Sequence, residues 1–139
     1  VYIIDTGIYT SHTQFGGRAS NVYDAFGGSG SDCNGHGTHV GGTVGGSTYG
    51  VAKGVRLRGV RVLNCSGSGT WSGIIAGIDW VAGKGGIEVA NLSLGGSKSS
   101  AVNAAVAGAV GSGVSVVVCS GLSVWTSSRS AHERISPSA

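Results

Sequence analysis

Asp5 and His36 are the residues of this sequence whose types and settings point most clearly to chemistry. Asp5 ends the apolar run Val-Tyr-Ile-Ile-Asp and is followed by Thr6-Gly7. A carboxylate at the C-terminal end of a strand lies at the ligand-binding edge of a sheet, where backbone amides can hold it ionised. The same Asp-Thr-Gly can also simply begin a turn. Asp5 is therefore a candidate functional carboxylate, with a turn residue as the alternative.

His36 stands in the segment Asn-Gly-His-Gly-Thr-His-Val at residues 34–40, where flanking glycines leave space beside its ring. A single histidine can also be a surface or core residue, and His36 with His39, three positions apart, could suggest a metal site. The metal interpretation is disfavoured because no further Cys, His or acidic residue stands at ligand spacing in the same segment. We assign no metal ligand.

These residues must be positioned by alternating strands and helices. Apolar or alternating runs predict strands over 1–5, 55–63, 87–94 and 114–119, and small-residue or helically spaced segments predict helices over 35–44, 70–82 and 101–110. We expect a loop between the first strand and Asn34. Strands that alternate with helices predict a parallel α/β sheet with right-handed crossovers, in which functional residues gather where strands end.

The composition excludes several classes of protein. There are 28 glycines among the 139 residues, far above the ordinary share of roughly 7%, which excludes a helical bundle. With 40% hydrophobic residues the chain can build the core of a single domain. The net charge of +3 is mild, and we expect Arg56, Arg58 and Arg61 to form a solvated face, which disfavours nucleic-acid binding. No apolar run reaches the roughly 18 residues of a membrane span.

The chain divides into two parts by character. Residues 1–121 carry the segments with helical or strand periodicity. Residues 122–139 are polar, hold the only proline and show neither of these periodicities, so we expect an irregular tail. The sequence opens at Val1 and contains no methionine, so we expect it to be part of a longer product.

Four segments, in order along the chain, resemble the subtilisin-like serine peptidases. They are Val-Tyr-Ile-Ile-Asp-Thr-Gly-Ile at 1–8, Asn-Gly-His-Gly-Thr-His-Val at 34–40, Tyr-Gly-Val-Ala-Lys at 49–53 and Asn-Leu-Ser-Leu-Gly-Gly at 91–96. The resemblance is to the proteinase K branch, particularly its aqualysin-like bacterial members, and runs to about residue 121. It implies the N-terminal portion of a three-layer, parallel-sheet α/β fold and a serine endopeptidase with an Asp-His-Ser triad.

By this resemblance, Asp5 matches the triad aspartate and His36 the triad base. The order Asp, His, Ser is the one expected of this fold. The imidazole would take the serine proton and return it to the leaving amine, while the carboxylate fixes the tautomer and stabilises the imidazolium. His39 would then pack within the helix, and His12 and His132 would lie on the surface.

The resemblance also implies a peptide-binding cleft. Backbone with little side chain suits pairing with a peptide strand, although without the resemblance these glycines would be interpreted as ordinary turn residues. Trp71 would border a hydrophobic subsite. The expected substrate-binding residues are Gly67, Ser68, Gly69, Trp71, Ser93, Leu94 and Gly95.

Cys33 and Cys65 match cysteines that form a disulfide in the aqualysin-like branch. A bridge closing a loop of this size would stabilise the fold by roughly 3 to 4 kcal/mol and implies an oxidising, extracellular location. Cys119 lies in an apolar run and has no partner by this resemblance, so we expect a small buried residue.

The chain departs from the family pattern towards its end. No serine stands in the family's Gly-Thr-Ser-Met-Ala context, so the 139 residues alone should be inactive. Leu122 occupies the position of an asparagine that donates to the developing oxyanion, a donor worth about 10² to 10³ in rate. The abrupt loss of resemblance after residue 121 suggests a reading-frame error in the coding sequence.

The implied enzyme acts on polypeptides as a secreted monomer, with no nucleic-acid or membrane partner and no cofactor for its chemistry. Structural calcium is common in the family, but no residue here matches a ligand. Two alternatives stay open. A retroviral-type aspartic peptidase would explain an apolar run before Asp-Thr-Gly, with two carboxylates sharing a proton in a homodimer, although it has no use for the histidine segment. A non-catalytic peptide-binding domain would explain why Leu122 stands where the family has an asparagine that donates to the oxyanion.

Overall fold

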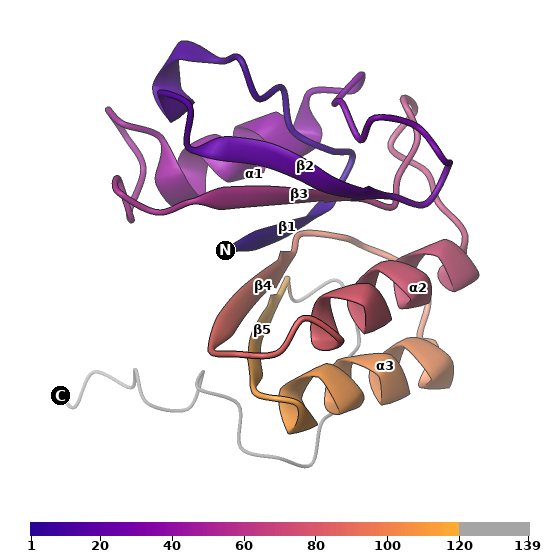
Figure 1. Cartoon of the computed structure of the whole chain (residues 1–139). Coiled ribbons are helices and arrows are strands. Elements are labelled where there is room, and N and C mark those ends of the chain that lie inside the picture. The colour runs from indigo at the N-terminus through magenta and orange to yellow at the C-terminus, as the bar shows by residue number, and fades with distance from the viewer. Residues whose placement is uncertain (120–139) are drawn as a thin grey trace, which may run out of the picture.

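The computed structural model describes residues 1–119, which form a parallel sheet with helices on both faces (Figure 1). The strands of this part are β1 (Tyr2–Asp5), β2 (Ala19–Asp24), β3 (Leu57–Arg61), β4 (Glu88–Leu92) and β5 (Val114–Val118), and its α-helices are α1 (His36–Gly45), α2 (Trp71–Ala82) and α3 (Ser100–Gly111), with a 3-10 turn at Thr13–Phe15. All strand pairs are parallel, in the order β2-β3-β1-β4-β5. The predicted α/β alternation is confirmed.

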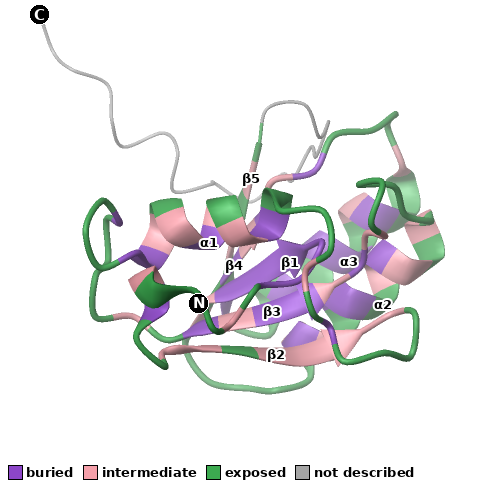
Figure 2. Ribbon diagram, turned by 90° about the horizontal axis from the view of Figure 1, so that it is seen from above, coloured by how far each residue is buried: buried purple, intermediate pink, exposed green. Residues whose placement is uncertain are grey.

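The central strand β1 explains the layers, because its side chains point alternately to the two faces of the sheet. Tyr2 and Ile4 pack with α2 and α3 on one face. Ile3 packs on the other face with Phe15 and the α1 side chains. Figure 2 shows the buried residues concentrated in β1, β3 and the helix surfaces that face them. The expected three-layer arrangement is therefore confirmed.

Helix α2 forms where the sequence spacing predicts it. Its buried Ile74, Ile78 and Val81 recur at helical spacing along one face. The Thr70 hydroxyl accepts a hydrogen bond from the amide of Gly73 at 3.1 Å, which caps the first turn. Helix α3 lies beside α2 (Figure 1), and Ser99 caps it in the same way. The two helices together cover one face of the sheet.

Strand β2 corrects the expectation of a continuous loop between β1 and Asn34. Its sequence, Ala-Ser-Asn-Val-Tyr-Asp, lacks a clean apolar alternation, because β2 is an edge strand whose residues stay only partly buried. It forms through its ladder to β3 and through Asn21, whose carboxamide donates to the Ile8 carbonyl and accepts from the Ile8 amide.

The arginines of β3 also differ from the expected solvated face. Arg56 is exposed, but Arg58 and Arg61 are half-buried. Arg58 donates to the Tyr2 hydroxyl at 2.9 Å, and the Arg61 guanidinium lies 3.5 Å from the Asp24 carboxylate. These side chains join strands rather than face solvent.

Candidate active site

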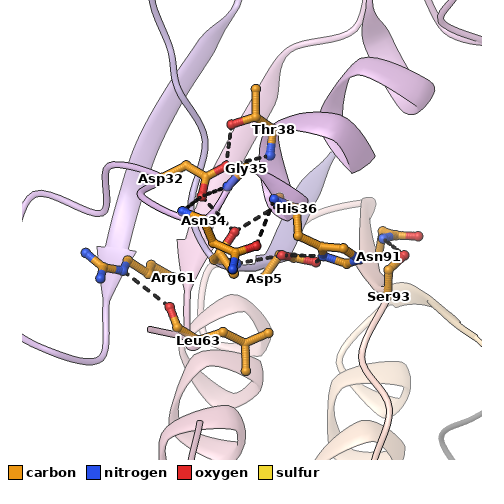
Figure 3. Close-up of polar contacts among 12 residues, drawn as sticks. Asp5, Asp32, Asn34, Gly35, His36, Thr38, Arg61, Leu63, Asn91 and Ser93 are labelled. Atoms are coloured by element: carbon orange, nitrogen blue, oxygen red, sulfur yellow. Dashed lines mark hydrogen bonds and ion pairs between the residues drawn. The ribbon is translucent and has the colours of Figure 1, made fainter. Parts of the chain in front are cut away.

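Asp5 and His36 meet at the C-terminal edge of the sheet, where β1 ends and α1 begins (Figure 3). The Nδ1 atom of His36 lies 2.8 Å from Oδ1 and 2.9 Å from Oδ2 of Asp5. A carboxylate can only accept, so the neutral ring carries its proton on Nδ1 and leaves Nε2 as an acceptor. An imidazole with a free Nε2 can act as a general base.

The two side chains differ sharply in exposure. The Asp5 side chain is fully buried, whereas 49% of the His36 side chain is exposed. A buried carboxylate is costly unless it is hydrogen-bonded, and Asp5 accepts from the Thr6 amide at 2.7 Å as well as from the ring. The fixed carboxylate thus lies behind a ring whose other side is open to solvent.

A close backbone approach brings α1 to the end of β1. A Cβ atom on Gly37 would lie 2.2 Å from the Gly7 carbonyl oxygen, so only glycine fits there. The Gly37 amide donates to the Thr6 hydroxyl at 2.9 Å, and Thr6 is fully buried. Gly37 is therefore required for the packing of α1 against the end of β1, and it also leaves space beside the His36 ring.

Asp32 was not singled out from the sequence, yet it organises the loop before α1. Its carboxylate accepts hydrogen bonds from the Thr6 hydroxyl, the Asn34 and Gly35 amides, and both the amide and hydroxyl of Thr38. Burial pushes the pKa of Asp32 upward, but these hydrogen bonds outweigh burial and lower the pKa below its ordinary value. In the sequence, the available signal for Asp32 was an acidic residue just before the predicted helix at 35–44.

The expected substrate-binding residues gather with His36 around one pocket of about 570 Å³. The pocket lies between the connection from β3 to α2 and the segment that follows β4. Its lining includes Gly67, Ser68, Gly69, Trp71, Ser93, Leu94 and Gly95. The structure thus brings all seven to the same surface as the imidazole.

The two walls of this pocket have different backbones. Gly67 has φ 75° and lies in a turn closed by the hydrogen bond from the Asn64 amide to the Ser68 carbonyl, so the backbone of this wall is turned rather than extended there. On the other wall Gly95 is exposed, and a Cβ atom on it would meet nothing within 4 Å. The Trp71 ring packs against Gly96, where a Cβ atom would lie 2.3 Å from the ring. Trp71 thus touches the opposite wall.

The Cys33–Cys65 disulfide implied by the resemblance is present. It joins the loop before His36 to the turn at residues 64–68, and the Asn34 side chain donates to the Cys65 carbonyl at 3.0 Å beside it. Both cysteines are exposed. The bridge therefore ties one wall of the pocket to the segment that carries the imidazole.

Two expectations about single residues are wrong. His39 is exposed on α1 rather than packed, because its position faces away from the sheet. Cys119 is exposed rather than buried, because it follows the edge strand of the described residues, and its thiol donates to the Leu94 carbonyl at 2.8 Å.

His12 is exposed, as expected. Leu122, His132 and the tail at 122–139 lie outside the described residues.

Neither a metal cluster nor a membrane helix is found between residues 1 and 119. No three His, Cys, Asp or Glu side chains of this part converge to hold a metal ion. No helix of the same part has the length and apolar character needed to cross a membrane.

Known proteins resemble this chain in sequence and in fold. A model of the subtilase family, peptidase S8, matches residues 1–135. Alkaline serine exoprotease A of Vibrio alginolyticus is 58% identical over 123 residues, which cover 86% of this chain and 23% of that protein. An extracellular serine proteinase of Thermus sp. (strain Rt41A) is 56% identical over 124 residues, covering 86% of this chain and 30% of the relative.

A solved structure of a cold adapted subtilisin-like serine proteinase superposes with a TM-score of 0.82 at 58% identity, covering 84% of this chain and 44% of that one. The chain thus spans less than half the length of these relatives. The parallel α/β sheet does not favour the aspartic-peptidase alternative, which is an all-β fold. Matched over nearly its whole length and folded like a solved proteinase of this type, the chain belongs to the subtilase family.

Proposed function

We propose that this chain supplies the general base and its orienting carboxylate to a serine endopeptidase. His36 is the base and Asp5 orients it. The observation that carries the proposal is the 2.8 Å contact between the half-exposed imidazole and the fully buried carboxylate. Membership of the subtilase family supports the same assignment.

The chemistry follows from the free Nε2 atom. As a serine oxygen attacks the peptide carbonyl carbon, Nε2 takes the hydroxyl proton, and the buried Asp5 carboxylate stabilises the imidazolium that forms. The imidazolium then gives the proton to the leaving amine, and a water molecule repeats the sequence to release the acyl group. The nucleophile is a serine in a family context that this chain does not carry.

Polypeptides are the proposed substrates, bound between the two pocket walls. On the Ser93–Gly95 wall, Gly95 is exposed and carries no side chain, so a peptide strand can reach the backbone groups of this residue. The opposite wall contributes Gly67–Gly69. Trp71 supplies apolar surface for a substrate side chain, since its ring is only partly buried.

Extracellular action is part of the proposal. The exposed Cys33–Cys65 bridge would persist only in an oxidising compartment, and the Thermus relative is named an extracellular proteinase. We infer a secreted monomer whose chemistry needs no cofactor. Residues 1–121 are proposed as the N-terminal part of the catalytic domain.

A chimera tests the function directly. Residues 1–119 replace the matching segment of the Vibrio alginolyticus exoprotease, whose 58% identity favours correct packing. We expect the chimera to cleave internal bonds of an unfolded polypeptide, detected by mass spectrometry. The His36→Ala chimera should lose about 10⁶-fold in kcat, as subtilisin does on loss of its histidine.

The exposed His39→Ala change on the same helix is the matched control and should leave kcat unchanged. Equal activity in the His36→Ala and parent chimeras would refute the assignment. Tight peptide binding by a folded parent chimera that cleaves nothing would instead favour a non-catalytic peptide-binding domain.

A further inference from the structure

We propose that Asp32 is a positioning residue, which fastens the start of α1 to the end of β1 and so holds His36 against Asp5. This inference deepens the proposed function and rests on it. It concerns how the pair is held, because Asp32 itself touches neither ring nitrogen of His36.

The pair needs an external fastening because its members belong to different elements. Asp5 is the last residue of β1 and His36 the first of α1, 31 positions later. The first amides of a helix also have no partners within the helix. Without bonds across this junction, the first turn of α1 could shift and carry the imidazole away from the carboxylate.

The Asp32 carboxylate makes bonds on both sides of the junction. Its Oδ1 atom accepts from the Thr6 hydroxyl at 2.8 Å and from the Gly35 amide at 2.9 Å. Its Oδ2 atom accepts from the Thr38 amide at 3.0 Å and from the Thr38 hydroxyl. One side chain therefore holds the residue after Asp5 together with residues on both sides of His36.

Thr6 completes the fastening. Its buried hydroxyl donates to Asp32 and accepts from the Gly37 amide at 2.9 Å. The residue after Asp5 is thus bonded to the residue after His36 as well as to Asp32. The pKa of Asp32 is lowered by its hydrogen bonds, so the carboxylate is ionised at neutral pH, and hydrogen bonds to an ionised acceptor are the strong ones.

A purely structural role would have a different signature. If Asp32 only stabilises the loop, its replacement lowers stability but leaves His36 bonded to Asp5 in every molecule that stays folded. If Asp32 positions the pair, the Nδ1 proton of His36 becomes exposed to water in a chain that is still folded. The exchange rate of that proton separates the two roles.

The experiment uses the 139-residue chain labelled with ¹⁵N and follows the Nδ1 proton of His36 by NMR, assigned by its loss in His36→Ala. Asp32→Asn and Thr6→Val should each speed its exchange with water by about tenfold, the factor expected for loss of one charge-assisted hydrogen bond. Thr6→Ser, which keeps the hydroxyl, should restore the slow exchange. Amide spectra report whether each variant is folded.

Two variants are matched controls. Thr43→Val removes a hydroxyl from the same helix, where Thr43 donates to the His39 carbonyl on the exposed side. Asp79→Asn removes an exposed carboxylate from α2. Neither should change the exchange rate of the His36 proton.

Each result decides between the claims. Slow exchange in folded Asp32→Asn and Thr6→Val would overturn the positioning role of Asp32 and leave the proposed function intact. If the unsubstituted chain carries no Nδ1 proton on His36, the Asp5–His36 pair itself is wrong and the proposed function fails. Unfolding of both variants would make the role one of folding alone, which also overturns the inference.

Discussion

The two sides of the candidate cleft are built in opposite ways. At the junction of β1 and α1, Asp5 and Thr6 are fully buried and hydrogen-bonded, and the loop that leads to His36 is tied by a disulfide. After β4, by contrast, Gly95 and Gly96 are exposed and Gly95 has open space around it. The groups proposed to react are held by many contacts, whereas the wall proposed to bind a peptide is open at Gly95.

The same contrast extends into the sheet. Around β1 both faces are covered, one by α1 and the other by α2 and α3. Within residues 1–119, β4 and β5 are covered on the face that packs against α2 and α3. On their other face, 37% of Val89 and 54% of Val117 are exposed. The hydrogen-bonded part of the site therefore coincides with the most completely packed part of the fold.

Replacement of Asp5 should have the largest effect. In the chimera, Asp5→Asn should lower kcat by about 10⁴-fold, the size of the loss for the same change in other serine peptidases, because the imidazole loses its orienting acceptor. Steady-state kinetics with a peptide amide measure it. Asp24→Asn is the control, since Asp24 is equally a buried carboxylate but pairs with Arg61. A comparable loss of kcat in both variants would mean that buried charge, not the His36 contact, matters.

Removal of the disulfide should come next. Replacing Cys33 and Cys65 with serine should lower the free energy of unfolding of the 139-residue chain by roughly 3 to 4 kcal/mol, because the bridge restricts the unfolded chain. Urea denaturation at neutral pH measures the change. Cys119→Ser, at an exposed free cysteine, is the control. An unchanged midpoint in the double variant would show that the junction does not depend on the bridge.

Two glycines test the contrast between the β1–α1 junction and the wall after β4 most simply. Gly37→Ala should destabilise the fold by about 1 to 3 kcal/mol, because its methyl group would press on the Gly7 carbonyl. Gly95→Ala should change stability by less than about 0.5 kcal/mol, since the added methyl meets open space. In the chimera, however, Gly95→Ala should raise KM. Equal stability losses would remove the distinction between a packed junction and an open wall.

The smallest expected effect concerns acid. The pKa of Asp32 is lowered from its ordinary value of 3.8 in the fold, so its ionised form stabilises the protein above that pH. This contribution is lost as the pH falls through the lowered value. The difference in unfolding free energy between the unsubstituted chain and Asp32→Asn should therefore shrink below pH 3.8. A constant difference from pH 7 to pH 2 would contradict this linkage.

Much of the fold could be predicted because it follows from periodicity. The run that ends at Asp5 and the helical spacing of Ile74, Ile78 and Val81 are local signals, and both elements formed where they were expected. Strand β2 could not be predicted in this way, because an edge strand is held by backbone pairing and needs no apolar face. The local pattern of apolar residues therefore predicts strands covered on both faces more reliably than it predicts edge strands.

The site shows the same division. His36 stands out by its glycine setting, and the resemblance implied the disulfide, which is present. Asp32 did not stand out, because its importance comes from donors that the fold gathers around it, including Thr6, which lies 26 positions earlier. Cys119 is exposed rather than buried, because an apolar run does not tell whether its last residue lies at the edge of the sheet.

The most direct test of the central claim is covalent labelling with a serine-directed phosphonate, located by mass spectrometry. The account predicts that the chimera is labelled at one serine outside residues 1–119, that His36→Ala nearly abolishes this labelling, and that the 139-residue chain alone takes up no label. Stoichiometric labelling of any serine in the isolated chain, or labelling of the His36→Ala chimera at the parent rate, would contradict it.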